Sequence, residues 1–505
     1  MIDTGHENLH LQSESGDLSS ENTKLRSELA AAQQRLAQLE QKLSFQPQSG
    51  LPTHFRLELE LEEFVERFGR RQDDGSANLP GFTVLILQLG STYGMVRKTL
   101  RASISEWILY QTGCRIAAFL SGRDRVFHTR EDEFVLLLPG KKGSHLKEFL
   151  QKLHTSLAVP HGFTGFSVSV GVTSGASYFP EHGLNRSDLL HHADLAAGAA
   201  KDRHKPFVLF RQSIREIAVE RMELQNSILK AIEAPALHQL GEQFRLLYQP
   251  KLVVSSFDEG KLHISKIGAE ALMRWNHPSK GLISPAQFIP IAEESGLIEP
   301  LGKWLVYTCA SLLEAWTTTG YGDIGLSVNL SPRQFRSSSI LQTFESALSS
   351  SGSGLNRLTV ELTETSLFED IESTTRILER FAALGLRISV DDFGSGYSSL
   401  SHLHRFPLDE IKVDRLFVEH IRTNKHDRVI VGSLVHMAKD LGFDLIVEGV
   451  EDAESLAILY DMGCRGYQGF VLSEALSEEE FLRFHDDIVA NDMVVQLPLA
   501  LTHQS

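Results

Sequence analysis

One four-residue pattern recurs in the second half of the chain, as LSVN (326–329), LTVE (358–361), ISVD (388–391), IKVD (411–414) and LIVE (445–448). Side chains alternate between the two faces of a strand, so the first and third positions form an apolar face. The second and fourth positions share the other face, and the polar fourth residue comes where the apolar run stops. Several parallel strands that end in carboxylates on one rim are typical of a barrel active site that binds metal. Together the repeats predict such a site.

The composition limits the classes of protein to which the chain can belong. Its 505 residues suit two or three domains, and the hydrophobic content of 42% is ordinary for a soluble globular protein. The formal charge of −16 opposes binding to nucleic-acid polymers and anionic membranes, although a small anionic substrate stays possible where metal ions neutralise the site. Without a bilayer-length apolar run or a signal sequence, we expect a cytoplasmic protein with no membrane span. Cys114, Cys309 and Cys464 form neither a disulfide framework nor a zinc pattern.

The first 46 residues predict a polar tail followed by a coiled coil. Residues 1–20 lack apolar periodicity and are expected to be disordered. Within 21–46, apolar residues recur at alternating steps of four and three, which is a heptad pattern, at Leu25, Leu29, Ala32, Leu36, Leu39 and Leu43. A coiled coil would make the protein a homodimer or relay a signal, and a lone amphipathic helix packed on its own domain is the alternative.

The rest of the chain divides into four segments. Residues 47–210 alternate apolar strands with helical stretches and predict an α/β domain, and residues 211–240 predict a linker helix. Residues 241–492 contain eight strand candidates, from FRLLYQPKLVV to YQGFVLSEAL, separated mostly by helical stretches. This order and length predict a (β/α)8 barrel. Residues 493–505 are expected to form a C-terminal tail.

Three motifs in the barrel segment resemble the EAL domain family: EALMRWNHP (270–278), DDFGSGYSSL (391–400) and EGVED (448–452). The resemblance covers nearly the whole segment. It implies a modified (β/α)8 barrel that hydrolyses cyclic di-GMP to linear pGpG with two divalent metal ions. Some family members only bind cyclic di-GMP, and these typically lack some of the acidic residues.

The resemblance also implies ligands for two Mg²⁺ or Mn²⁺ ions. The set is Glu270, Asn329, Glu361 and Asp391 for one ion, and Asp391, Asp392 and Glu448 for the other. Hard oxygen ligands suit these ions better than zinc or copper, and a shared carboxylate suits two ions held close together. Every ligand position matches the family pattern, so the sequence favours turnover over binding alone.

Lys412 and Asp414 share one face of the IKVD strand. By resemblance, Lys412 orients or helps deprotonate the attacking water, and Asp414 holds that lysine. A lysine among many carboxylates should stay charged, which favours positioning and electrostatic stabilisation over a free-amine base. A purely structural ion pair inside the barrel is the alternative.

The same resemblance assigns the remaining site residues. Glu364 would steady the loop that follows DDF, where Ser395 stands in place of the usual threonine. Glu451 and Gln468 belong near the metals and the water, with Gln468 also meeting the substrate. Gln249, Leu272 and Arg274 match positions that contact the substrate, and the planar guanidinium of Arg274 would suit a phosphate.

Residues 49–210 resemble a GGDEF domain, the family that makes cyclic di-GMP from two GTP molecules. SGLPTHF, REDEFVLLLPG, GFSVSVGVT and LLHHADLAAGAAK carry the likeness. Arg130 and Glu131 replace the two signature glycines, where a bulky side chain should fill the space of the triphosphate. Upstream metal aspartates appear as Gln88 and Gly90. We therefore predict a degenerate domain without cyclase activity.

The motif for product inhibition in this domain is also incomplete, because Ser121 stands at its arginine position although Asp124 remains. The domain would serve as scaffold and dimer contact, with binding of GTP as an alternative. The leading hypothesis is thus a cyclic di-GMP phosphodiesterase. A catalytically silent cyclic di-GMP receptor is the second possibility, and an enzyme with both activities is the third.

Overall fold

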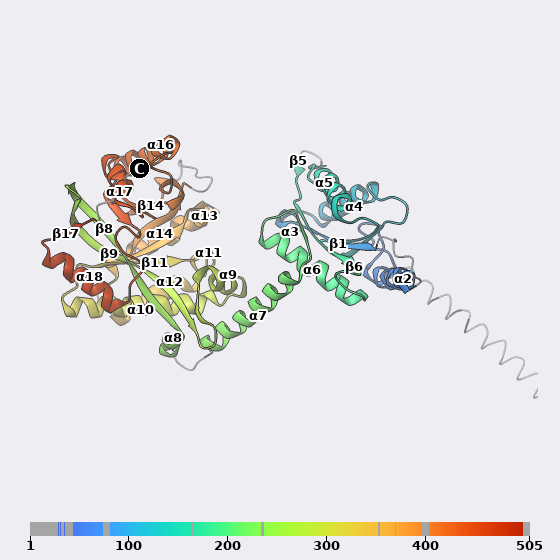
Figure 1. Ribbon diagram of the computed structural model, residues 1–505, viewed down its shortest axis with the longest axis horizontal. Coiled ribbons are helices and arrows are strands. Elements are labelled where there is room, and N and C mark those ends of the chain that lie inside the picture. The colour runs from blue at the N-terminus through green and yellow to red at the C-terminus, as the bar shows by residue number, and fades with distance from the viewer. Residues whose placement is uncertain are drawn as a thin grey trace, which may run out of the picture. The chain divides into compact units, whose positions relative to one another are not determined.

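The computed structural model describes residues 29, 31, 35, 44–73, 81–163, 166–233, 237–351, 354–368, 370–394 and 403–497. The chain forms two compact units, Met1–Glu220 and Arg221–Ser505 (Figure 1). The predicted disordered tail, nearly all of the predicted coiled coil and most of the GSGYSS loop lie outside the described residues. Among the described helices, none has both the length and the apolar character that crossing a bilayer requires.

The first unit is built on a five-stranded sheet in the order β2-β3-β1-β6-β7. Its strands are β1 (Phe82–Leu89), β2 (Arg125–Arg130), β3 (Glu133–Pro139), β6 (Val172–Phe179) and β7 (Phe207–Leu209). The central strand β1 pairs antiparallel with both β3 and β6. Its side chains alternate between two apolar clusters, so both faces of the sheet are buried, which explains the almost continuous apolar run FTVLILQL.

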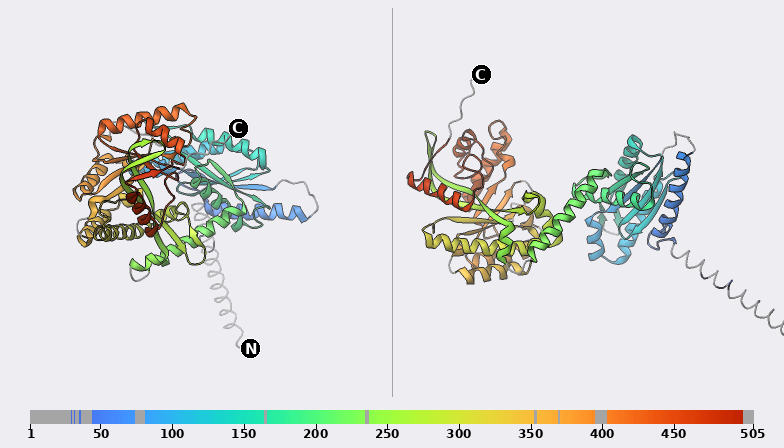
Figure 2. Two further views of the ribbon diagram at one scale, coloured as in Figure 1. Left: turned by 60° about the vertical axis from the view of Figure 1, so that its left-hand side comes forward. Right: turned by 60° about the horizontal axis from the view of Figure 1, so that its bottom comes forward.

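Helices cover both faces of this sheet (Figure 2). The helices are α2 (His54–Asp73), α3 (Ser91–Thr99), α4 (Ala102–Ala118), α5 (Gly143–Leu157) and α6 (Arg186–Asp202). Residues of α2 and α6 pack into one cluster, and residues of α3, α4 and α5 pack into the other. A short hairpin, β4 (His161–Phe163) with β5 (Phe166–Val168), follows α5.

The hairpin histidine makes the stability of this unit sensitive to acid. Burial, with a smaller contribution from the charge of Arg115, lowers the pKa of His161 to about 4. The unfolded chain therefore binds a proton that the folded unit does not, so the stabilisation is complete above about pH 6.5 and is lost as the pH falls toward 4. We expect the melting temperature of the first unit to fall between pH 7 and pH 5, and to fall less in His161→Phe, as measured by calorimetry. Equal pH slopes in both proteins would contradict this assignment.

The described part of the second unit forms an eight-stranded barrel in the order β9-β11-β12-β13-β14-β15-β16-β8, closed by pairing of β8 with β9. Strand β9 and strands β11 to β16 run parallel to one another, whereas β8 runs antiparallel to both of its neighbours, β9 and β16. This confirms the expected modified barrel. The strands are β8 (Phe244–Asp258), β9 (Lys261–His277), β11 (Gly325–Leu330), β12 (Leu358–Thr363), β13 (Arg387–Phe393), β14 (Glu410–Val413), β15 (Asp444–Val447) and β16 (Gly466–Gln468).

Helices connect the parallel strands on the outside of the barrel (Figure 1). Helix α9 (Pro285–Ser295) begins after Ser284 and is followed by Gly296, whose φ of 80° is the left-handed conformation that glycine adopts without strain. The remaining helices and turns are α8 (Leu237–Gln243), α10 (Ile298–Thr319), α11 (Pro332–Phe335), α12 (Ser339–Ser351), η1 (Gly354–Arg357), α13 (Glu364–Phe368), α14 (Ile371–Ala383), η2 (Arg415–Phe417), α16 (Lys425–Leu441), α17 (Ala453–Asp461) and α18 (Glu478–Ala490).

Helix α7 (Gln212–Ile232) lies in the segment 211–240, where the sequence predicts a linker helix, and the division between the two units falls inside it, after Glu220. Part of the predicted C-terminal tail is a strand, β17 (Val494–Gln496), which pairs antiparallel with β9. Strand β9 is longer than its parallel neighbour β11, so one edge of its first residues would have unpaired backbone groups. Strand β17 provides hydrogen-bond partners for part of this edge.

Candidate functional site

The ends of the parallel strands place the predicted site residues on one rim of the barrel. Glu361 on β12 pairs in register with Asn329 on β11, and Asp391 on β13 pairs with Thr363, just beyond Glu361. Glu270 on β9 pairs with Gln249 of β8. Because the strand ends meet at the same edge, polar residues far apart in the sequence become neighbours there.

Lys412 on β14 is the centre of the cluster. Its side chain is only 1% exposed, and its ammonium lies between carboxylates from several strands. The distances from Nζ are 2.5 Å to Glu448, 2.6 Å to Glu361, 3.1 Å to Glu270 and 3.3 Å to Asp391. One buried cation thus contacts four of the predicted metal ligands.

Amide groups hold Glu270 in place on the opposite side of the cluster. Asn329 Nδ2 donates to Glu270 Oε1 at 2.5 Å, and Gln468 Nε2 donates to Glu270 Oε2 at 2.7 Å. Gln468 also donates to Gln249 Oε1 at 3.2 Å. Since each carboxylate oxygen has a donor, the orientation of Glu270 is determined by its neighbours.

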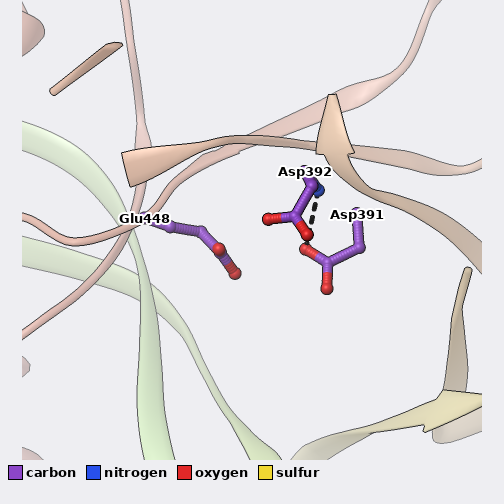
Figure 3. Close-up of side chains that lie close together, drawn as sticks. All are labelled: Asp391, Asp392 and Glu448. Atoms are coloured by element: carbon purple, nitrogen blue, oxygen red, sulfur yellow. Dashed lines mark hydrogen bonds between the residues drawn. The ribbon is translucent and has the colours of Figure 1, made fainter. Parts of the chain in front are cut away.

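Asp391, Asp392 and Glu448 form a group in which one carboxylate oxygen of each residue lies within 4.8 Å of the others (Figure 3). The backbone N–H of Asp392 donates to Asp391 Oδ1 at 3.0 Å. Asp392 has a φ of 53°, an uncommon left-handed conformation for a residue with a side chain, and this turns its carboxylate toward the group. Oxygen donors in this arrangement fit a hard divalent cation such as Mg²⁺ or Mn²⁺.

Burial and mutual repulsion change the proton affinity of the cluster. Burial, and then the charge of Glu270, raise the pKa of Glu361 to about 8. Burial also raises the pKa of Glu448 to about 7, and desolvation of its carboxylate, followed by the charge of Asp391, raises the pKa of Asp392 to about 6. Burial alone would lower the pKa of Lys412, but the surrounding carboxylates raise it well above its usual value. Lys412 therefore stays charged. The raised pKa values of the carboxylates show that this one positive charge does not balance all of their negative charges.

A cavity of about 290 Å³ opens at this rim. Of the predicted substrate residues, Gln249, Leu272 and Gln468 line it, whereas Arg274 is not among its lining residues. The guanidinium of Arg274 donates instead to the carbonyl oxygen of Met273 at 3.0 Å. The other lining residues are Glu270, Asp391, Lys412, Arg415, Glu448, Gly449, Glu451, Gly469 and Phe470.

Of the predicted catalytic residues, Asp414 does not make the contact with Lys412 that the resemblance implies. Asp414 accepts from the backbone N–H of Leu416 at 2.9 Å and caps η2, and no ion pair between it and Lys412 occurs in the described structure. Glu451 pairs with Arg415 at 2.8 Å at the mouth of the cavity. Glu364 Oε2 accepts from the backbone N–H of Gly394 at 2.9 Å, at the start of the loop that we expected it to steady.

Sequence reasoning missed a second ion pair beneath the cluster, formed by Lys251 on β8 and Glu410 on β14. A signal was present, because Lys251 shares a strand face with Gln249 and Glu410 shares one with Lys412. The pairing itself joins residues 159 positions apart and follows only from the closed barrel. Arg415 and Phe470, which line the cavity, were also missed.

The degenerate signature of the first unit forms its own closed set of contacts. Glu133 is 5% exposed and accepts from Thr129 Oγ1 at 2.6 Å and from Gln88 Nε2 at 3.4 Å. Arg130 pairs with the same carboxylate at 3.4 Å, and Arg97 pairs with Glu131. Both carboxylate oxygens of Glu133, one of the two acids that remain in the signature, therefore have protein partners.

Asp124, the remnant of the predicted inhibition motif, is also engaged. Lys141 Nζ lies 2.7 Å and 2.6 Å from its two carboxylate oxygens, and the backbone N–H of Ser121 donates to it at 3.0 Å. The Asp124 side chain is 3% exposed. It contributes to the core of the first unit.

Comparison with known proteins matches both units. The model of the EAL domain matches residues 233–475, and the model of the diguanylate cyclase, GGDEF domain, matches residues 47–206. The bifunctional diguanylate cyclase/cyclic di-GMP phosphodiesterase MucR of Pseudomonas aeruginosa is 31% identical over 433 residues, which are 86% of this chain and 60% of MucR. The cyclic di-GMP phosphodiesterase PdeR of Escherichia coli is 33% identical over 355 residues, which are 70% of this chain and 51% of PdeR.

The chain thus spans between half and three fifths of the length of these two relatives. Among solved structures, Vibrio cholerae LapD S helix-GGDEF-EAL, bound to c-di-GMP, has a TM-score of 0.55 at 16% identity and covers 88% of this chain and 100% of its own. That likeness shows the fold, with the two domains in the same order along the sequence. Both expected resemblances are confirmed: the chain belongs to the family of proteins in which a GGDEF domain precedes an EAL domain.

Proposed function

We propose that the second unit hydrolyses cyclic di-GMP to linear pGpG, with two Mg²⁺ or Mn²⁺ ions as cofactors. The observation that supports this most directly is the convergence of Glu270, Glu361, Asp391 and Glu448 on one buried lysine. Such an excess of buried carboxylates is unfavourable without further cations, and divalent ions would supply them. The choice of substrate is supported by the relatives MucR and PdeR, both of which are named as cyclic di-GMP phosphodiesterases.

In this proposal the ligand set is the one that the resemblance to the EAL family implies. Glu270, Asn329, Glu361 and Asp391 would hold one ion, and Asp391, Asp392 and Glu448 would hold the other. When bound, two such ions stabilise the attacking and leaving oxygens of a phosphodiester displacement. The oxygen-only donor set and the close group of Asp391, Asp392 and Glu448 support this assignment.

The chain's own residues bind the substrate and position the water. Lys412 Nζ donates to the attacking water and remains charged throughout, since its pKa is raised. Gln249, Gln468 and Leu272 meet the dinucleotide in the cavity, while Arg274 contacts only a part of it that extends along β9. The water oxygen bonds to phosphorus as one 3′ P–O bond breaks, and the leaving 3′ oxygen takes the proton. The product is linear, with one 5′ phosphate.

The first unit has a structural or regulatory role in this proposal and makes no cyclic di-GMP. The side chains that stand where the signature has glycines support that role, since Arg130 pairs with Glu133 and Glu131 pairs with Arg97 where the nucleotide would need open space. Homodimerisation through the predicted coiled coil, and binding of GTP by the first unit, remain proposals of the same kind.

The decisive experiment incubates the purified full chain with cyclic di-GMP and separates the products by chromatography. With Mg²⁺ or Mn²⁺ we expect pGpG, and after treatment with EDTA we expect none. Ca²⁺ should support binding with little turnover, because its coordination is longer and looser. Binding of cyclic di-GMP without turnover in Mg²⁺ and Mn²⁺ would favour a silent receptor. Consumption of GTP would show the second activity that the name of MucR includes.

A further inference from the structure

The inner layer of the barrel, directly beneath the cluster, contains a second buried lysine. Each member of this layer lies two residues inward from a site residue on the same strand face: Lys251 from Gln249, Ser327 from Asn329, and Glu410 from Lys412. Lys251 is 9%, Glu410 5% and Ser327 1% exposed. The barrel therefore stacks one polar layer on another.

Lys251 is anchored within this layer by two neighbours. Its Nζ donates to Ser327 Oγ at 2.8 Å and lies 2.9 Å and 3.2 Å from the two oxygens of Glu410. These partners come from β11, which is two strands from β8 around the closed barrel, and from β14, which is three strands from β8 in the other direction. Three strands thus place one ammonium at a defined point beneath the site.

The same ammonium lies 3.7 Å from Glu361 Oε1. The other oxygen of that carboxylate, Oε2, lies 2.6 Å from Lys412 Nζ. Glu361 is completely buried, and Oε1 has no hydrogen-bond partner among the described residues. Glu361 is therefore held between two lysines, one in the site and one below it.

We propose that Lys251, anchored by Glu410 and Ser327, is a positioning residue that orients the Glu361 carboxylate for divalent-cation binding. The attraction of Lys251 keeps Glu361 Oε1 directed into the inner layer of the barrel, so that Glu361 Oε2 points toward the rim. Without it, both oxygens would turn to the remaining cation, Lys412, and the ligand would be drawn away from the ion. This inference rests on the proposed function in one respect, namely that Glu361 is a metal ligand.

The energetics of burial argue against a purely structural pair. A buried ion pair stabilises a fold little more than an apolar pair of the same volume, because desolvation offsets the attraction. Hydrophobic side chains would close the barrel interior equally well at these positions. A lysine and a glutamate there are explained by the third partner, Glu361, which an apolar residue could not orient.

The test separates folding from orientation with a pair of variants of the full chain. Lys251→Met leaves Glu410 buried without its cation and should lower the melting temperature of the second unit. Lys251→Met combined with Glu410→Met removes both charges and should restore the melting temperature. In the restored double variant we expect the Kd for Mn²⁺ to stay about 10- to 100-fold above that of wild type, as measured by titration calorimetry on chelator-treated protein. Wild-type affinity in the double variant would overturn the proposal.

A milder variant and a control complete the design. Ser327→Ala removes one anchor of Lys251 without leaving a charge unpaired, so it should fold, and we expect a smaller loss of Mn²⁺ affinity in the same direction. Arg357 lies just before β12 and donates hydrogen bonds to the carbonyl oxygens of Leu313 and Ile324. Arg357→Met removes these bonds and should lower the stability of the second unit without changing Mn²⁺ affinity. Unchanged affinity in Ser327→Ala together with the double variant would leave Lys251 a structural residue. Failure of wild type itself to bind Mn²⁺ or to cleave cyclic di-GMP would instead contradict the proposed function.

Discussion

Replacing Glu270 with alanine is expected to reduce the turnover of cyclic di-GMP by at least about a hundredfold, the smaller of the losses seen when one electrostatic stabiliser leaves an active site. The substitution removes the shared partner of Asn329, Gln468 and Lys412, at 2.5, 2.7 and 3.1 Å. Asn329 and Gln468 would then lose their common acceptor, and the proposed first ion would lose a ligand. Steady-state kinetics at saturating Mg²⁺ measure the effect.

A matched control distinguishes this loss from a general effect of removing a glutamate. Glu345 lies on α12, pairs with Arg380 at the surface at 3.0 Å and is not among the residues that line the cavity. Glu345→Ala should retain wild-type turnover, because surface ion pairs contribute little. Full activity in Glu270→Ala would remove the basis for the proposed metal site.

Replacing Lys412 with methionine is expected to have the largest effect on stability. Four carboxylates would lose their common buried cation, and an uncompensated buried charge typically costs about 3–5 kcal/mol. The carboxylates would then favour the protonated state more strongly than they do now, so the metal-free variant should be more stable at pH 5 than at pH 8. Thermal unfolding at the two pH values measures this. Turnover should also fall by about 10²–10⁴, as for the loss of a positioned proton-transfer group.

Thermal unfolding of the Lys412→Met variant in the presence of Mn²⁺ is the second measurement. If divalent cations occupy the same carboxylates, Mn²⁺ should raise the melting temperature of Lys412→Met more than that of wild type, because it replaces the missing charge. Lys303→Met, at an exposed position of α10, is the control and should behave as wild type. A variant that is stable without Mn²⁺ and insensitive to pH would show that the carboxylates do not depend on Lys412.

Much of the candidate site could be predicted from strand periodicity and the EAL-like motifs. Glu361, Asp391 and Lys412 each follow or interrupt a short apolar run, and alternation places them on the inner face of their strands. Local alternation could not show which of these residues contact one another. Asp414 illustrates this, since it shares a face with Lys412 yet caps η2 through Leu416.

The predicted substrate residues show the same difference between what strand alternation predicts and what it cannot. Gln249 and Leu272 line the cavity as expected, but Arg274 contacts the backbone of its own strand instead. A two-residue step along a strand keeps the face but moves the side chain by about 7 Å, which is enough to leave a small cavity. The motif therefore identifies the strand more reliably than the reach of each side chain.

The sequence by itself determined the order of the two domains, the eight barrel strands and the excess of acidic side chains at their ends, because each depends on residues close together in the chain. The tertiary structure alone decided that Lys412 contacts four carboxylates, that Lys251 lies beneath Glu361, and that Glu133 of the first unit is paired with Arg130. Lys251 and Glu410 are 159 residues apart, and only closure of the barrel brings them within 2.9 Å. Periodicity sets the face on which a side chain lies, whereas its partners depend on strand pairing and stagger around the whole barrel.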